Sequence, residues 1–244
     1  MPFFILISSF FLFSCTHTSE KKESPKVYFE KATKYKKNKN YQKALEYILR
    51  LRQNFFESSY NQKALLMTAD IYFEQEKYPQ ALLSYRKYQK LYYNSDQAYV
   101  IYQIALCYRN QIPSRVTYDL TVADKSLLEI TKLLTLDSPY KEKALKLKQE
   151  ILNKKAEKEL ETISFFKKLG WYQAGFKRVK DFLSLYSKSS LKPKALLIAV
   201  RLAEEIKEDS TPFRTELLKE YPRSKFAKKL KNRSFFDRIK WNIL

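Results

Sequence analysis

Apolar residues recur along most of this chain at intervals of three and four positions, which is the spacing of an amphipathic helix. The pattern also repeats as a whole. The stretch NYQKALEYILRLRQNFFESSY at 40–60 matches KYPQALLSYRKYQKLYYNSDQ at 77–97, so that Ala44 corresponds to Ala81. A repeat of this length predicts a chain built from successive helical units.

Small residues mark the points where pairs of helices are expected to cross. Ala32 lies twelve positions before Ala44, and Ala69 lies twelve positions before Ala81. Two helices approach closely only where the side chains between them are small. Larger side chains are then expected to fill the space beside each crossing: Tyr35, Ile48, Tyr72 and Tyr85. The unit resembles the tetratricopeptide repeat, a helix–turn–helix of about 34 residues that stacks into a solenoid with a concave side.

Three later units continue the pattern less regularly. The third covers 97–138, and the fourth covers 139–190 and opens with a long uninterrupted helical pattern from Tyr140 to about Leu169. Gly170 is expected to end that helix, since glycine is common just after a helix. A fifth unit begins at LKPKALLIAVRLAEEI and closes with LLKEYPRSKF. We therefore predict an all-α, tetratricopeptide-like helical repeat solenoid of about five helix–turn–helix units, with a plain helical bundle as the alternative.

The closing phrases of the units share a serine that is expected to cap the following helix by accepting a backbone N–H bond. The five serines are Ser58, Ser95, Ser138, Ser189 and Ser224.

The N-terminus carries a short apolar run that ends at a cysteine. Phe3–Phe13 is uncharged and too short to span a membrane as a helix. It has the length of the apolar core of a secretory signal, and the following Leu-Phe-Ser-Cys resembles the lipobox of bacterial lipoproteins. We expect Cys15 to be lipidated and to begin the mature chain. An Asp directly after the cysteine would favour retention in the inner membrane. The residue there is Thr16, which favours the outer membrane. A plain secretory signal or a buried strand is the other interpretation.

Composition removes most catalytic chemistry. The chain has two glycines, Gly170 and Gly175, which leaves no phosphate-binding loop or dinucleotide fingerprint. It has one histidine and, after Cys15, only Cys107, which leaves no disulfide framework, zinc site or catalytic triad. Charge-mixed runs such as KKAEKELE at 154–161 are typical of solvated helix faces. We therefore expect no enzyme, no catalytic residue, no metal and no cofactor.

The net charge of +21 is large, but the lysines are spread over every segment instead of forming one basic block. A generally solvated basic surface explains this distribution, and attraction to anionic lipid head groups near the anchor is the functional alternative. We expect no nucleic-acid partner.

Three further stretches are distinctive: AYVIYQIALCY at 98–108, SRVTYDLTVADKSL at 114–127 and GWYQAGFKRVKDFLSLYSKS at 170–189. They resemble the BamD family, the lipoproteins of the bacterial outer-membrane β-barrel assembly machine. The last matches the family's Gly-x-Tyr/Trp-x-x-Ala-x-x-x-Arg-Val pattern, with Ser187 in place of a proline. The resemblance covers roughly residues 25–225.

The resemblance implies a lipid-anchored protein on the periplasmic face of the outer membrane. Its C-terminal repeats would bind the periplasmic POTRA domains of a BamA-like, barrel-forming subunit. Arg178 matches an arginine of that contact, and Arg115 and Asp119 fit the family's irregular loop in the third unit. Arg178 also occupies a position that many repeats fill with a buried apolar residue, so a structural ion pair is the alternative.

The N-terminal repeats, by the same resemblance, would offer a groove to the C-terminal targeting strand of unfolded outer-membrane β-barrel proteins. That strand ends in an aromatic residue, which suits an aromatic-lined groove. The candidate groove residues are Tyr28, Tyr35, Tyr72 and Tyr102. Packing within each repeat is the alternative interpretation of every one of them.

The predicted organisation follows from these motifs. It comprises a signal peptide at 1–14, a tether at 15–25, repeats 1 and 2 at 26–96, repeats 3 to 5 at 97–225, and a basic C-terminal extension at 226–244. Two other classes stay open: a pilotin or cell-wall-coordinating repeat lipoprotein, and a periplasmic polyanion binder that uses charge alone.

Overall fold

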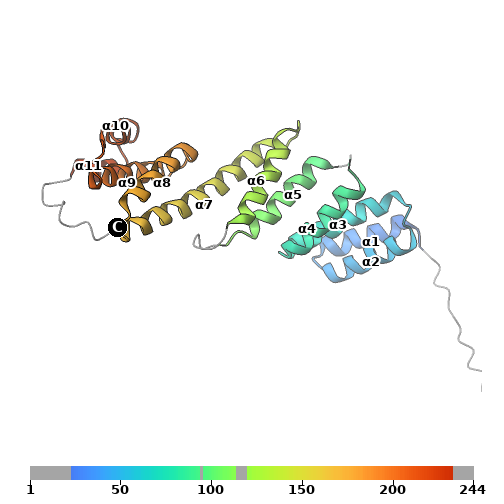
Figure 1. The fold of residues 1–244 in the computed structure, drawn as a ribbon. Helices are drawn as coiled ribbons and strands as arrows, with labels where there is room; N and C mark the ends of the chain where they lie inside the picture. Colours follow the sequence, from blue (N-terminus) through green and yellow to red (C-terminus); the bar gives the residue numbers. More distant parts are fainter. Residues whose placement is uncertain (1–22, 94–95, 114–119, 233–244) are drawn as a thin grey trace, which may run out of the picture. The chain divides into compact units, whose positions relative to one another are not determined.

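The computed structural model describes residues 23–93, 96–113 and 120–232, which form eleven helices joined by turns and loops, without a strand (Figure 1). The fold is therefore all-α, as the helical periodicity predicts. The chain divides into two compact units, one up to Ala64 and one from Leu65 onward, and the division falls within helix α3 (Ser59–Glu74).

The first unit contains the first predicted helix pair. Helices α1 (Pro25–Lys37) and α2 (Tyr41–Asn54) pack against each other along their length. Ala32 and Ala44 are both fully buried at 0% exposure, as the twelve-residue spacing predicts. Ile48 is buried beside them. The crossing thus has the small and large residues where the sequence pattern places them.

The second unit begins with the remainder of α3, followed by α4 (Tyr78–Leu91) and α5 (Gln97–Asn110). These three helices share one core cluster, in which Ala69, Ala81 and Tyr85 are fully buried. Helix α6 (Thr121–Leu134) packs on α5 and completes the third pair. Its core residues Ala123, Ile130 and Leu133 join Ile101 and Ala105 of α5.

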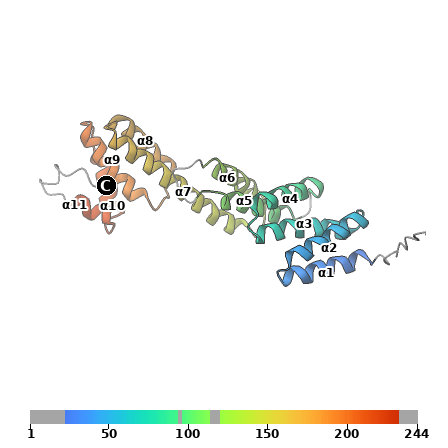
Figure 2. The ribbon, with the colours of Figure 1, turned by 90° about the horizontal axis from the view of Figure 1, so that it is seen from below.

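Helix α7 (Lys141–Lys168) is continuous over 28 residues, and both views show it leading from the α6 region to α8 (Tyr172–Leu185) (Figures 1 and 2). Its first half buries Ala144, Leu147 and Ile151 in the cluster formed with α5 and α6. Its second half buries Ala156, Leu160 and Ile163 against α8 and α9 (Lys192–Glu205). One helix therefore belongs to two neighbouring repeats. Gly170 follows it with φ +74°, which confirms the predicted helix end.

The turns inside the repeats have one geometry. Lys39, Glu76, Gly170 and Lys207 all have positive φ values, between 57° and 74°. In each turn the next residue donates its N–H to a carbonyl five positions back, as Asn40 does to Tyr35 at 2.9 Å and Trp171 to Phe166 at 2.9 Å. This is the bond that satisfies the last carbonyls of a helix in the Schellman motif. Three of these positions carry Lys or Glu, so the presence of glycine in the sequence identifies only the turn at Gly170.

The chain ends, as far as the structure describes it, in α10 (Thr211–Glu220) and α11 (Lys225–Lys231). Ala227 and Leu230 of α11 are buried against α9 in a cluster with Leu197 and Leu217. The predicted C-terminal extension thus begins inside a helix that packs on the fifth repeat.

The predicted serine caps are partly correct. The hydroxyl of Ser224 accepts the N–H of Ala227 at 3.1 Å and caps α11. Ser58 and Ser189 accept the N–H two residues ahead, which orders the approach to the next helix. The prediction is wrong for Ser138, whose hydroxyl is buried without a hydrogen-bond partner among the described residues. Ser95 lies outside the described residues.

We predict that Ala81→Trp destabilises the protein by about 1–3 kcal/mol or more, because an indole cannot fit at a fully buried helix crossing. Leu83→Trp is the matched control on the same helix, since Leu83 is 71% exposed and its replacement should change stability little. Urea unfolding of both variants measures the difference. Equal stabilities would show that the crossing is not tightly packed.

Candidate functional site

Arg178 lies on α8 and forms an ion pair with Glu159 on α7. Its Nε donates to one carboxylate oxygen, and its NH2 group donates to the other at 3.3 Å. The guanidinium also lies 5.6 Å from the centroid of the Phe166 ring. The Arg178 side chain is 42% exposed and that of Glu159 is 22% exposed. Arg178 is thus held in one orientation by an ion pair within the chain, as the structural alternative expects, although its side chain is partly exposed and not buried.

A hollow of about 500 Å³ surrounds this pair. It is lined by Glu159, Phe166, Ala174, Lys177, Arg178, Asp181, Phe182, Leu185 and Tyr186. Leu185 is 72% exposed at its edge, whereas Val179 and Phe182 beneath it are fully buried. The surface combines a fixed cation, both signs of charge and an exposed apolar side chain on a rigid support. These are the components of a protein-binding surface.

Glu159 is the residue that sequence reasoning missed. It lies in the charge-mixed run KKAEKELE, which the sequence identifies only as a solvated helix face. The signal was weak because Glu159 and Arg178 are nineteen residues apart and meet only when α7 and α8 fold against each other.

Two predicted groove tyrosines lie in the first unit, and both are half-buried by aromatic neighbours. Tyr35 stacks on Tyr47 with ring centroids 5.4 Å apart, and the Lys43 ammonium lies over the Tyr35 ring, 5.4 Å from its centroid. Tyr28 lies 6.3 Å from Tyr47 and 5.9 Å from Phe55. The two tyrosines thus share Tyr47 as a common partner.

The other two predicted groove tyrosines lie in the second unit. Tyr72 is half-buried against the core shared by α3, α4 and α5. Tyr102 stacks on Tyr140 at 5.3 Å, and Tyr140 lies 6.0 Å from Tyr99. Burial, with a smaller contribution from Tyr140, raises the pKa of the Tyr102 hydroxyl. All four predicted groove tyrosines therefore pack against other residues of the chain, and each is half-buried.

A carboxylate organises the interior between the second and third repeats. Asp70 on α3 accepts hydrogen bonds from the hydroxyls of Tyr85, at 2.6 Å, and Tyr99, at 2.7 Å. Burial first, and the Asp70 charge second, raise the pKa values of both hydroxyls. The three side chains come from three helices, so this network fixes how α3, α4 and α5 meet. The sequence pattern did not identify it, because it treats Tyr85 only as a filler of space.

A buried acid joins α4 to α6. The Glu129 side chain is 2% exposed, and Arg86 donates to it at 2.7 Å while Lys132 donates at 3.0 Å. The second oxygen of Glu129 has no hydrogen-bond partner among the described residues. A carboxylate buried in this way is stable only while its cations remain, which ties two helices from neighbouring repeats together.

Cys15, Arg115 and Asp119 lie outside the described residues. Within the described ranges no three His, Cys, Asp or Glu side chains are grouped to hold a metal ion. Burial raises the pKa of the Cys107 thiol to about 12. None of the described helices combines the length and apolar character needed to cross a bilayer.

Comparison with known proteins identifies the family. The family model YfiO, described as an outer membrane lipoprotein, matches residues 21–211, which is most of the chain. The chain belongs to this family. Membership in the YfiO family associates the protein with the outer membrane and its lipoproteins. The matched region includes α1 to α9 and contains Arg178, Glu159 and all four tyrosines.

Solved structures of tetratricopeptide repeat proteins are also similar to the chain, at low sequence identity. The P58(IPK) repeat domain is 15% identical with a TM-score of 0.44, covering 84% of this chain and 53% of its own length, so the chain spans about half of it. The TPR2AB domain of yeast Sti1 is 12% identical with a TM-score of 0.46, covering 83% and 80%. PilF of Pseudomonas aeruginosa is 13% identical with a TM-score of 0.37, covering 85% and 81%. No curated protein sequence matches the chain.

We predict that Arg86→Leu destabilises the fold by about 3 kcal/mol, because it removes the shorter of the two ion pairs that hold the buried Glu129 carboxylate. Adding Glu129→Leu should restore most of that loss, since an apolar pair needs no compensation for a buried charge. Arg50→Leu removes an exposed pair with Glu46 and should cost about 1 kcal/mol or less.

Urea unfolding of the three variants measures these differences. If the double variant is no more stable than Arg86→Leu alone, the burial of Glu129 is not the cause of the loss.

Proposed function

We propose that this YfiO-family protein is a non-catalytic, lipid-anchored subunit of the outer-membrane β-barrel assembly machine. The observation that carries the proposal is the family match over residues 21–211, which covers the repeats that form the candidate surfaces. An array of helical repeats with rigid cores suits a scaffold, because such arrays present extended surfaces to several partners. The anchor at Cys15 would hold this scaffold on the periplasmic face of the membrane.

In this proposal the C-terminal repeats bind a BamA-like POTRA domain through the hollow around Arg178. A guanidinium carries five N–H donors, and Glu159 uses those of Nε and one terminal nitrogen. The remaining donors are available to a carboxylate on the partner. Glu159 therefore orients Arg178 before binding, which lowers the entropy that the contact loses. Exposed Leu185 would supply apolar area at the edge of the same surface.

The N-terminal tyrosines would receive the targeting strand of unfolded barrel proteins. Tyr28 and Tyr35 offer one such surface on the first unit, and Tyr72 and Tyr102 offer another on the second; each of these residues is half-buried. A ring held in this way offers flat apolar surface at little entropic cost. Arg115 and Asp119, which lie outside the described residues, belong with Arg178 among the proposed contacts to the BamA-like partner.

We predict that Arg178→Ala weakens POTRA binding by about tenfold or more, because truncating one partner of a charge pair at an interface costs roughly 2–5 kcal/mol. The free protein should lose about 1 kcal/mol of stability or less, since the pair with Glu159 is half-exposed. Calorimetric titration with a purified POTRA domain, together with urea unfolding, measures both quantities.

Arg214→Ala is the matched control, because Arg214 forms a pair of similar exposure with Glu204, at 40% and 28%. Arg214→Ala should lower stability by about as much as Arg178→Ala but leave POTRA binding unchanged. Unaltered affinity in Arg178→Ala would reject the contact, and equal losses of affinity in both variants would show a general effect on folding.

We predict that Cys15→Ser prevents lipidation and releases the protein from the outer-membrane fraction, or leaves an unprocessed precursor. The physical reason is that acyl chains contribute roughly 0.8 kcal/mol for each buried CH₂ group, and two or more chains hold a protein stably on a membrane. Metabolic labelling with a radioactive fatty acid tests this. A wild-type protein that is processed without taking up label would be an ordinary secreted protein.

A further inference from the structure

A second concave surface lies between α7, α9 and α11. Two adjoining pockets, of about 730 Å³ and 700 Å³, share Ser164, Leu191 and Lys194 among their lining residues and form one depression, here called the α7–α9 groove. None of its residues lines the hollow around Arg178. The groove is therefore separate from the proposed POTRA surface.

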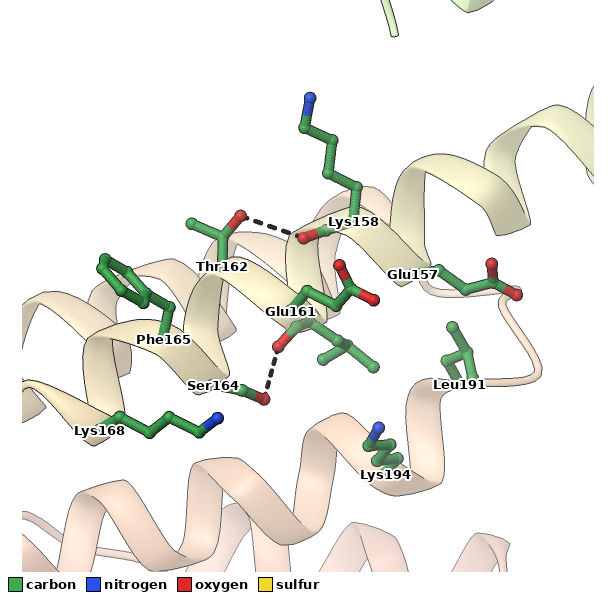
Figure 3. A pocket seen from close by; sticks show the side chains of 10 residues that line it. Glu157, Lys158, Glu161, Thr162, Ser164, Phe165, Lys168, Leu191 and Lys194 are labelled. Atoms are coloured by element: carbon green, nitrogen blue, oxygen red, sulfur yellow. Dashed lines mark hydrogen bonds between the residues drawn. The ribbon is translucent and has the colours of Figure 1, made fainter. Parts of the chain in front are cut away.

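Two lysine side chains from the walls of the groove extend toward its centre. Figure 3 shows Lys168 on α7 and Lys194 on α9 extending into the space between the two helices, near Ser164. The Ser164 hydroxyl donates to the Leu160 carbonyl at 2.7 Å and is thus directed at its own helix. The polar character of the groove centre accordingly comes from the two ammonium groups.

The two ends of the groove differ in charge. The end at α11 is lined by five cationic side chains and no carboxylate: Lys167, Lys194, Arg201, Lys225 and Lys229. The end nearer the start of α7 carries both signs of charge: Glu157 and Glu161 line it together with Lys158, whose side chain Figure 3 shows extending away from α9. The pKa of the Lys167 ammonium is lowered by burial and then by the charges of Arg201 and Lys229, although Glu205 acts in the opposite direction. Arg201 and Lys229 are therefore close enough to Lys167 to repel its ammonium group.

The base of the groove at the α11 end is apolar. Leu191, Leu197, Ile198, Leu202 and Phe226 line it. Leu197 and Leu202 are buried in the cores of the fourth and fifth repeats, so this base is fixed. An occupant would meet a rigid apolar surface beneath a row of cations.

We propose that the α7–α9 groove binds an extended peptide segment of a partner protein, acidic where it meets α11, apolar over the base, and basic where it meets Glu157 and Glu161. Charge complementarity gives the two ends, and the lining of the base gives the middle. The stretch of α7 from Glu157 to Lys168 rises about 16 Å, at about 1.5 Å per residue. About five residues of extended chain span that distance.

The presence of carboxylates at only one end of the groove favours a peptide over an anionic lipid. A phospholipid head group would satisfy the cations at α11 but would place its negative charge or its acyl chain beside Glu157 and Glu161. A peptide carries both signs of charge at a fixed separation. Its carboxylates would also relieve the repulsion around Lys167, so that pairing is stronger here than at an isolated lysine.

The test uses the full mature chain without its lipid and a fluorescent six-residue peptide of two aspartates, three apolar residues and one lysine, with both termini capped. Capping removes the terminal carboxylate, so the probe does not imitate the free end of a targeting strand. We expect saturable binding that weakens as salt is added. Replacing both aspartates by asparagine, or the apolar residues by serine, should each weaken binding about tenfold or more.

Matched variants on one helix locate the site. Lys225→Glu with Lys229→Glu reverses two charges that line the groove and should weaken peptide binding about tenfold or more. Lys228→Glu with Lys231→Glu makes the same change in net charge on the same helix, outside the lining residues, and should leave most of the affinity. Helix content and urea unfolding of all variants are measured alongside.

Three results would overturn the proposal. The first is no binding at millimolar peptide. The second is equal binding by an isomer with one aspartate at each end and lysine in the middle, which would show attraction without recognition of the charge order. The third is binding of phosphatidylglycerol vesicles that depends on Lys225 and Lys229 while the peptide does not bind, which would make the groove a lipid site. POTRA binding by the Lys225→Glu, Lys229→Glu variant should stay unchanged, which separates this surface from that of Arg178.

Discussion

Close approach of helix pairs is the constraint on which the rest of this structure depends. Each helix buries only one face, so the chain is stable only if successive helices come near enough to share a core. Ala32, Ala44, Ala69 and Ala81 permit that approach because each adds only a methyl group at the crossing, and all four are fully buried. The stack of Tyr35 on Tyr47 and the hydrogen bond from Tyr85 to Asp70 lie on helices that these small residues bring together.

The sequence predicts the fold because helix crossing leaves a periodic record. Three features indicate the fold: the twelve-residue spacing of alanines, the long apolar pattern ending at Gly170 and the repeated closing phrases. Each involves residues that are close together in the sequence, so it can be recognised without the structure. The intra-repeat turns are partly hidden, since Lys39, Glu76 and Lys207 adopt positive φ without the glycine that usually marks it. Ser138 shows the reverse case: its position in the closing phrase predicts a helix cap, but its buried hydroxyl accepts no backbone N–H among the described residues.

The candidate site was less predictable because its chemistry is set between helices. Arg178 could be named from its motif, but its partner Glu159 lies on the preceding helix, in a run of alternating charges that resembles any solvated surface. Glu129 likewise reads as one more helical glutamate until α4 brings Arg86 to it across 43 residues. The sequence pattern reports which face of a helix is buried, whereas these pairs depend on the register of one helix against another. The charge order of the α7–α9 groove has the same origin.

The uninterrupted course of α7 has a consequence for cooperativity. In a simple repeat array, each unit unfolds with its own free energy and is coupled to its neighbours only through an interface. Here the third and fourth repeats share the backbone hydrogen bonds of a single helix, whose two halves are buried in two different cores. Opening either core therefore disturbs the backbone hydrogen bonds of α7, on which the other core also depends. We therefore expect the middle of the chain to unfold as one cooperative unit whose amides exchange with solvent at a common rate, while the terminal repeats open separately.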